Sequence, residues 1–234
     1  VLSALADGHR TLAGRGAGAL YLAPTKALAA DQLAHLEALA VPGVRAAAYD
    51  GDTPAQERAW VRAHANYVLT NPDMLHHAIL PGHEAWAGFW RSLRYVVIDE
   101  CHVYRGVFGA HVAAVLRRLR RICRRYGASP AFVFASATQP DPRRHARDLA
   151  GLDVLAVTED GSPRPARHVA FWQPPLRAGP DGGEVRRSAT AEAADLLADL
   201  VSRGVQTVVF ARSRAGAESV AAGARRALTE AHPQ

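Results

Sequence analysis

The sequence predicts an α/β fold, in which a parallel β-sheet is covered by helices on both faces. Short β-rich runs alternate with longer stretches of helical periodicity, which is typical of βαβ units. Residues 95–98 are apolar at every position, as expected for a strand that is buried on both faces. Polar residues directly follow several of these runs, which in an open α/β sheet places them at the edge where ligands bind.

Each element is predicted from its own pattern. Strands are expected where short runs are rich in apolar residues, at residues 18–23, 44–49, 67–70, 94–98 and 131–135. Helices are expected where apolar residues recur every three or four positions, at residues 26–39, 54–64, 107–126 and 140–149. Residues 1–9 resemble the end of a further helix.

The composition changes after residue 157. Residues 158–165 and 174–184 are rich in Gly, Pro and charged residues, as linkers and loops are. Around them we predict a strand at 167–172, an amphipathic helix at 189–202 and a buried strand at 205–210. We therefore assign residues 1–158 to a first domain, and residues 159–234 to a linker and the start of a second.

Composition excludes several classes of protein. With 234 residues, 49% of them apolar, the chain is globular and long enough for one domain and part of another. Its net charge of +6 suits a polyanionic partner, although nearly all its basic residues are Arg, a bias that a GC-rich genome also produces. Cys101 and Cys123 are too few for a disulfide framework. No membrane span or signal peptide is visible, so we expect no membrane partner and a cytoplasmic location.

The strongest chemical signal is Asp99-Glu100-Cys101-His102, directly after the apolar run 95–98. Two carboxylates at the end of a buried strand are costly unless they bind a cation or take part in chemistry. Ser136-Ala137-Thr138 ends another apolar run, and Pro24-Thr25-Lys26 ends a third. The alternative interpretation is a set of capped turns, because Asp, Ser and Thr also cap helices.

The sequences DECH, SAT and PTKALA resemble motifs II, III and Ia of superfamily-two DExH/DEAD-box helicases. YRGVFGAH at 104–111 and FARSR at 210–214, which is similar to motif IV, make the sequence most similar to bacterial mitomycin-repair-type helicases and their RecQ-like fungal relatives. This resemblance implies a two-domain core of RecA-like, P-loop NTPase fold, truncated at both ends. It also implies part of an ATP-dependent DNA helicase that translocates on single-stranded DNA and unwinds duplex in DNA repair.

The resemblance also assigns chemical roles, with ATP and Mg²⁺ as cofactors. Asp99 would bind Mg²⁺ through water, and Glu100 would orient and deprotonate the attacking water. His102 would couple this site to motif III. There, Ser136 and Thr138 would link hydrolysis to movement of the nucleic-acid strand.

A phosphate-binding loop needs Gly-Lys-Ser/Thr, and this sequence contains none. The single lysine, Lys26, lies between Thr25 and Ala27. We expect motif I to lie upstream of the chain and motifs V and VI outside it. The chain alone is therefore expected to be inactive as an ATP hydrolase.

The partner implied is single-stranded DNA, or duplex with a single-stranded tail. Its predicted contacts lie in motifs Ia, Ic, Ib and IV, at Pro24, Thr25, Lys26, Gly51, Asp52, Thr53, Thr70, Asn71, Pro72, Arg212 and Ser213. Contacts of this kind are made to sugar and phosphate groups, so they position the nucleic-acid strand without reading its sequence. The arginine-rich run 117–125 is interpreted instead as a solvated helix face. The histidines at 76, 77 and 83 are interpreted as surface residues, and the four tryptophans as core or interface residues.

Two alternatives stay open at this point. An RNA helicase or a double-strand DNA translocase would use the same fold, because no residue here reports on the 2′-hydroxyl that separates RNA from DNA. The sequence also assigns no oligomeric state. A non-catalytic nucleic-acid-binding module from a degenerate helicase would lack the phosphate-binding loop altogether, but the intact Asp99-Glu100 pair argues against such decay.

Overall fold

The computed structural model describes residues 1–8, 16–137, 139–163, 165–178 and 182–231. The chain divides into two compact units, Val1–Asp160 and Gly161–Gln234. Among the described residues, no helix has both the length and the apolar character that crossing a membrane requires.

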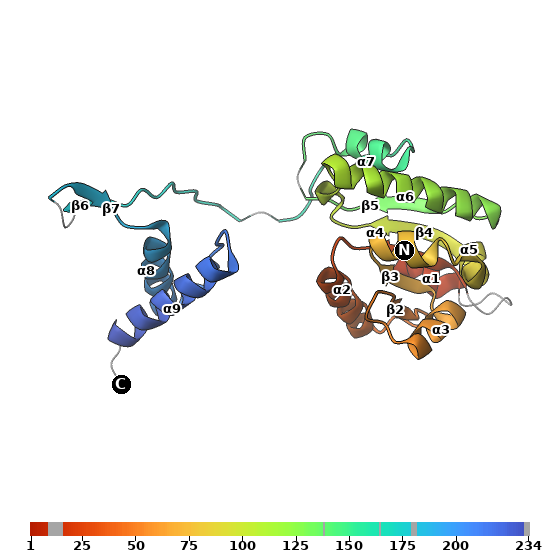
Figure 1. Ribbon diagram of the computed structural model, residues 1–234, viewed down its shortest axis with the longest axis horizontal. Coiled ribbons are helices and arrows are strands. Elements are labelled where there is room, and N and C mark those ends of the chain that lie inside the picture. The colour runs from red at the N-terminus through yellow and green to blue at the C-terminus, as the bar shows by residue number, and fades with distance from the viewer. Residues whose placement is uncertain (9–15, 138, 164, 179–181, 232–234) are drawn as a thin grey trace. The chain divides into compact units, whose positions relative to one another are not determined.

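The first unit is built on a parallel five-stranded sheet with the order β2-β3-β1-β4-β5, which confirms the predicted fold class (Figure 1). The strands are β1 (Gly18–Leu22), β2 (Ala46–Ala48), β3 (Tyr67–Thr70), β4 (Leu93–Ile98) and β5 (Ala131–Phe134). β1 lies in the centre and pairs with both β3 and β4. Helices connect successive strands, as parallel pairing requires.

The helices of this unit are α1 (Leu2–Gly8), α2 (Lys26–Leu39), α3 (Ala55–His64), α4 (Pro72–Met74), α5 (Ala87–Ser92), α6 (Gly106–Arg125) and α7 (Pro142–Ala150). Short helical turns lie between them at η1 (Leu75–Ile79), η2 (His83–Trp86) and η3 (Cys101–Val103). The longer helices begin and end close to the predicted positions.

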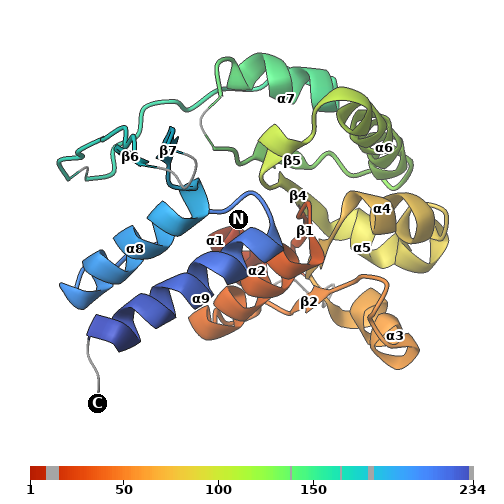
Figure 2. The same cartoon turned by 60° about the vertical axis from the view of Figure 1, so that its left-hand side comes forward.

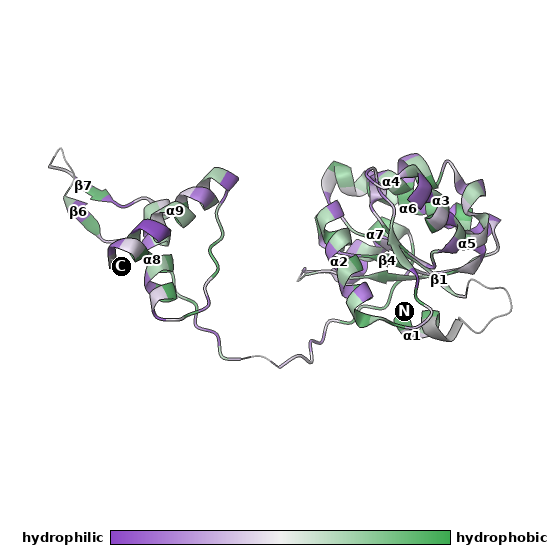
Figure 3. Cartoon of the chain, turned by 90° about the horizontal axis from the view of Figure 1, so that it is seen from below, coloured by the Kyte–Doolittle hydropathy of each residue, from purple (hydrophilic) through white to green (hydrophobic). Residues whose placement is uncertain are grey.

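Alternating residues of the strands build two cores, one on each face of the sheet. Leu20 of β1 and Val96 of β4 face the side on which the buried aromatic residues Trp86, Phe89 and Trp90 pack. The strands themselves are strongly hydrophobic (Figure 3).

The opposite face of the sheet carries the second core. Ala19 and Tyr21 of β1 and Val97 of β4 point to this side. They meet Leu5 of α1, and Leu33 of α2 packs against the same cluster. β1 and β3 are thus buried at every position, which explains why their sequences are almost entirely apolar, whereas alternate residues of the edge strand β5 are exposed.

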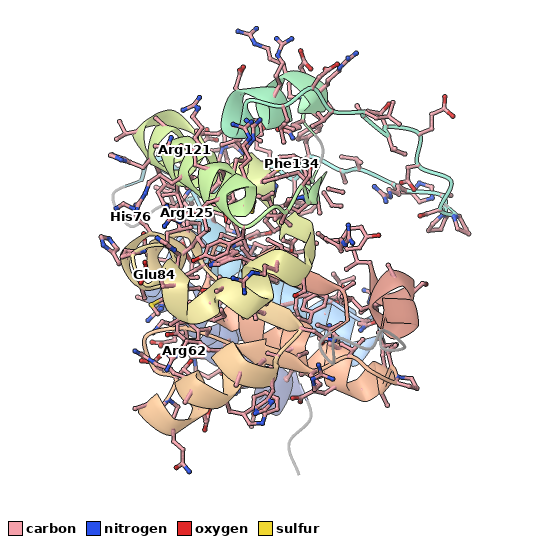
Figure 4. The ribbon with its side chains drawn as sticks, turned by 90° about the vertical axis from the view of Figure 1, so that its right-hand side faces the viewer. Arg62, His76, Glu84, Arg121, Arg125 and Phe134 are labelled. Carbon is pink, nitrogen blue, oxygen red and sulfur yellow. The ribbon has the colours of Figure 1, made fainter. Side chains whose placement is uncertain are left out.

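α6 presents an apolar stripe to the core and arginines to solvent. Leu116, Leu119 and Cys123 are buried, at the spacing of one helix face. Arg121 and Arg125 lie on the outer side (Figure 4). Arg120 differs, because its guanidinium donates to the carbonyls of Ala150 and Gly151 at 2.7 and 3.1 Å and so closes the end of α7.

The second unit contains β6 (Leu176–Ala178), β7 (Glu184–Arg186), α8 (Ala189–Ser202) and α9 (Arg214–Ala231). β6 and β7 form an antiparallel pair that the sequence did not predict. α8 occupies the predicted residues and packs against α9 (Figure 2).

The strands predicted at 167–172 and 205–210 are wrong. Neither segment is a strand, and Phe171 and Phe210 are 99% and 94% exposed. A strand exists only through pairing with a neighbour, and no other described segment pairs with either run. An apolar, β-rich pattern alone was therefore not enough to predict a strand at either segment.

The predicted tryptophan and histidine environments are only partly found. Trp60 and Trp172 are 45% and 62% exposed, so they are not core residues. The Trp172 indole N–H donates to Glu192 Oε1 at 2.9 Å. His83, predicted at the surface, is half-buried, with Nδ1 2.8 Å from the Tyr126 hydroxyl.

The start of α6, directly after the segment that follows β4, depends on two glycines. Gly106 has φ +57°, a conformation that favours glycine. At Gly109, a Cβ atom would lie 2.4 Å from the carbonyl oxygen of Tyr104. Gly109 therefore allows α6 to pack directly on the backbone of the segment that follows Asp99.

We predict that Gly109→Ala destabilises the protein by up to about 2 kcal/mol. The methyl group meets backbone that cannot rotate away, and this overpacking cost of about 1–3 kcal/mol exceeds the helix propensity gained, about 1 kcal/mol. Chemical denaturation measures the difference.

The matched control for this substitution is Gly161→Ala, where a Cβ atom meets nothing within 4 Å. We expect it to change the free energy of unfolding by less than about 0.5 kcal/mol. Equal stabilities for Gly109→Ala and Gly161→Ala would contradict the packing argument.

Candidate functional site

The carboxyl ends of the five parallel strands meet at one edge of the sheet, and hydrogen bonds keep the neighbouring ends in register. The Asp99 N–H donates to Leu22 O, and the Ala135 N–H donates to Ile98 O, both at 2.9 Å. The strand order therefore divides the predicted site residues of the first unit into two adjacent groups. One follows β4 and β5, and the other follows β2, β3 and β1.

Asp99 is half-buried, and both of its carboxylate oxygens accept hydrogen bonds. The Tyr21 hydroxyl donates to Oδ2, and the backbone N–H of Glu100 donates to Oδ1 at 2.9 Å. Burial, followed by the hydrogen bond to Asp99, raises the pKa of Tyr21 far above its ordinary value. Tyr21 therefore stays protonated and acts as a donor. Burial and the charge of Asp99 also raise the pKa of the neighbouring Tyr67 to about 12.

Glu100 adopts a left-handed backbone conformation, with φ 47° and ψ 38°, which is strained for a residue with a Cβ atom. Its Oε2 lies 3.1 Å from His102 Nδ1. The same nitrogen lies 3.3 Å from the backbone N–H of Ala137, which follows β5. The first contact needs a protonated Nδ1 and the second a deprotonated one, so Nδ1 can hydrogen-bond either to Glu100 or to the segment after β5, but not to both at once.

The loop that carries these groups is anchored at Cys101. The Cys101 N–H donates to Ala135 O at 2.9 Å, and His145 Nε2 of α7 donates to Cys101 O at 2.7 Å. Burial raises the pKa of the Cys101 thiol, which makes it an unreactive structural group. Ser136 is exposed and donates to Ala137 O at 2.8 Å. Thr138 lies outside the described residues.

The residues after β4 fit a hydrated Mg²⁺ better than a metal held by a protein cage. Within the described ranges, no group of three or more His, Cys, Asp or Glu side chains could hold a metal ion. Mg²⁺ usually keeps several waters and binds through one or two carboxylates and substrate phosphates. Asp99 suits this mode, because its side chain is not fully buried and each oxygen keeps a lone pair beside the hydrogen bond it accepts.

The second group of residues begins with the turn after β1. Thr25 caps α2, with its hydroxyl oxygen accepting from the Leu28 N–H at 3.2 Å. Lys26 follows, and its ammonium lies 2.6 Å from the carboxylate of Asp52, which follows β2. Both partners are exposed, so the predicted contacts of motifs Ia and Ic lie side by side.

The turn after β2 is organised by Asp50, which sequence analysis passed over as a site residue. Its Oδ1 accepts from the N–H groups of Asp52 and Thr53 at 2.8 and 3.1 Å. An Asp that bonds to the backbone two residues later is a recognised turn signal and could have identified this role. Gly51, which lies between Asp50 and Asp52, is exposed.

In the turn after β3, the predicted site residues Thr70 and Asn71 use their side chains to hold the protein's own backbone in place. Thr70 is buried, and its hydroxyl donates to Tyr49 O at 2.7 Å, which ties β3 to β2. Asn71 caps the following turn by accepting from the Met74 N–H at 2.9 Å. Pro24 is half-buried, and Pro72 is buried.

The last two predicted contacts, Arg212 and Ser213, belong to the second unit. Both are exposed, and Ser213 Oγ accepts from the Gly216 N–H at 3.1 Å at the start of α9. Sequence analysis missed Tyr21, Tyr67 and His145. No local signal marks these three residues, because their partners lie on other elements of the fold.

A family model described as DEAD/DEAH box helicase matches residues 2–145. Over 205 residues the chain is 47% identical to the "Uncharacterized ATP-dependent helicase YprA" of Bacillus subtilis (strain 168), covering 86% of this chain and 27% of that protein. It is 40% identical over 199 residues to the ATP-dependent helicase HRQ1 of Saccharomyces cerevisiae, covering 82% of this chain and 18% of that protein. The chain thus spans about a quarter or less of these relatives.

Solved structures give the same assignment. The crystal structure of the DUF1998 helicase MrfA bound to DNA and AMPPNP has a TM-score of 0.85 and 43% identity, covering 92% of this chain and 30% of that one. The helicase Lhr of Mycobacterium smegmatis, bound to ssDNA and AMP-PNP, has a TM-score of 0.66 and 25% identity, covering 93% and 29%.

Proposed function

Because this chain belongs to the DEAD/DEAH box helicase family, we propose that it is part of an ATP-dependent DNA helicase of the mitomycin-repair type. The complete protein would translocate on single-stranded DNA and unwind duplex. Support comes from similarity to helicases whose solved structures contain DNA and a nucleotide analogue. We propose that the first unit is the first RecA-like domain, and that the second unit begins the second such domain.

The observation that carries this proposal is the arrangement of Asp99, Glu100 and His102 beside the segment after β5. Bound Mg²⁺ would supply charge neutralisation at the phosphates of ATP. Asp99 would hold it through water. Glu100, with its carboxylate half-exposed, would orient a water molecule and accept its proton. His102 would transmit the state of this site to Ser136 and Thr138.

The turns after β1, β2 and β3 form the proposed path of the nucleic acid. α2 begins at this edge, and the N–H groups at a helix N-terminus favour phosphate oxygens. Lys26 adds a charge that can exchange its contact with Asp52 for a phosphate. Contacts of this kind hold the strand by its backbone and carry no sequence preference.

We predict that Glu100→Gln in the full-length protein leaves ATP binding intact and lowers kcat by about 10²-fold or more, because the water loses its general base. Single-turnover and steady-state ATP hydrolysis, together with nucleotide binding, would measure the effect.

A suitable control for this variant is Glu84→Gln, an exposed glutamate of η2, well away from the edge (Figure 4). It should hydrolyse ATP at the wild-type rate. If Glu100→Gln keeps about a third or more of the wild-type kcat, Glu100 is not the base.

We predict that Lys26→Ala weakens single-stranded DNA binding about equally for unrelated sequences. It should also lower the slope of log affinity against log salt by roughly 0.7, the value for one phosphate contact on a single strand. Affinity over a salt series for the full-length protein tests this.

The comparison variant for Lys26→Ala changes Arg121, Arg124 and Arg125 to Ala, because all three are exposed on α6. Arg120 stays in place, since it holds the end of α7. This variant should keep the wild-type salt slope. Loss of binding here, with Lys26→Ala unaffected, would place the strand path on α6 instead.

A further inference from the structure

We propose that Tyr21 is a positioning residue for the carboxylate of Asp99, orienting it toward a hydrated Mg²⁺. This role rests on the proposed function of Asp99. It adds a residue of β1, outside the helicase motifs identified in the sequence, to the nucleotide half of the site.

The register of the sheet explains the contact. Tyr21 is the partner of Val97 in the pairing of β1 with β4, so Asp99, two residues later, lies diagonally across on the same face. Tyr67 pairs with Ala19 on the other side of β1. Tyr67, Tyr21 and Asp99 thus form a diagonal row across three adjacent strands.

The two donors to Asp99 act from different directions. The Glu100 N–H, on Oδ1, comes from the next residue in the chain and moves with the loop. The Tyr21 hydroxyl, on Oδ2, comes from the central strand of the sheet. Fixing the second oxygen from a buried strand restricts rotation of the carboxylate, which a single hydrogen bond from the local amide restricts less.

Tyr21 is itself held rigidly. Its side chain is buried in the core shared with Leu5 and Val97, and its ring centroid lies 6.2 Å from that of Tyr67. A hydroxyl on such a ring is an accurately placed donor. Donors behind a metal-binding carboxylate orient it and commonly change metal affinity about 10–100-fold when removed.

Tyr67 provides a matched comparison for Tyr21. It is a buried tyrosine in the same core and the same diagonal row. Its pKa responds to the charge of Asp99, but Tyr21 is the residue that donates to this carboxylate. Replacing either tyrosine by phenylalanine removes one hydroxyl and keeps the packed ring.

The test compares Tyr21→Phe, Tyr67→Phe and Asp99→Asn in the full-length protein. Binding of a fluorescent, non-hydrolysable ATP analogue is measured over a Mg²⁺ series, beside kcat and the melting temperature. We expect Tyr21→Phe to need about tenfold more Mg²⁺ for half-maximal binding and to recover kcat at high Mg²⁺. Tyr67→Phe should keep the wild-type Mg²⁺ requirement, and Asp99→Asn should lose Mg²⁺-dependent binding.

The outcomes separate the two proposals. If Asp99→Asn loses Mg²⁺-dependent binding while Tyr21→Phe binds like the wild type, Tyr21 has no positioning role and the proposed function stands. Equal shifts in Tyr21→Phe and Tyr67→Phe also overturn the proposal, because they reflect a general loss of core stability. If Asp99→Asn behaves like the wild type, the assignment of Asp99 itself fails.

Discussion

The position of β1 between β3 and β4 is the constraint on which the rest of the first unit depends. Through Tyr21 this strand contacts Asp99, which follows β4. Through the turn that it leads into, it places Lys26 against Asp52, which follows β2. The proposed nucleotide and nucleic-acid halves of the edge are therefore joined by one buried strand, and a small shift of β1 would move groups in both.

The loop after β4 illustrates how strain is held at this edge. The left-handed conformation of Glu100 costs about 1 kcal/mol or more, so the surrounding contacts must maintain it. Cys101 is tied to β5 and α7 through its backbone, and Gly109 lets α6 pack tightly on the end of the segment. Two of these anchors, at β5 and α7, are distant in sequence from the loop, and the third, α6, follows it directly. They leave the carboxylate of Glu100 accessible while fixing the backbone that carries it.

The sheet of the first unit was predictable because each of its strands is an apolar run bounded by polar turns. The motif residues after β4 and β5 followed from the same pattern. The contact between Tyr21 and Asp99 was not predictable, because it depends on the register of two strands 78 residues apart at the contact. The prediction of a strand at residues 205–210 was wrong for a related reason, since a β-rich pattern does not supply the neighbouring strand that pairing requires. Trp60 and Trp172 show that a large aromatic residue alone does not indicate burial.

The central claim is that the strand path and the nucleotide site share one edge and are separated by the order of its strands. Photo-cross-linking of single-stranded DNA with a diazirine on its backbone, to the full-length protein held with an ATP analogue, tests this most directly. Peptide mapping should place cross-links in the turns after β1, β2 and β3, at residues 24–28, 50–54 and 70–74. Cross-links confined to the arginine-rich end of α6, at residues 117–125, would contradict the account.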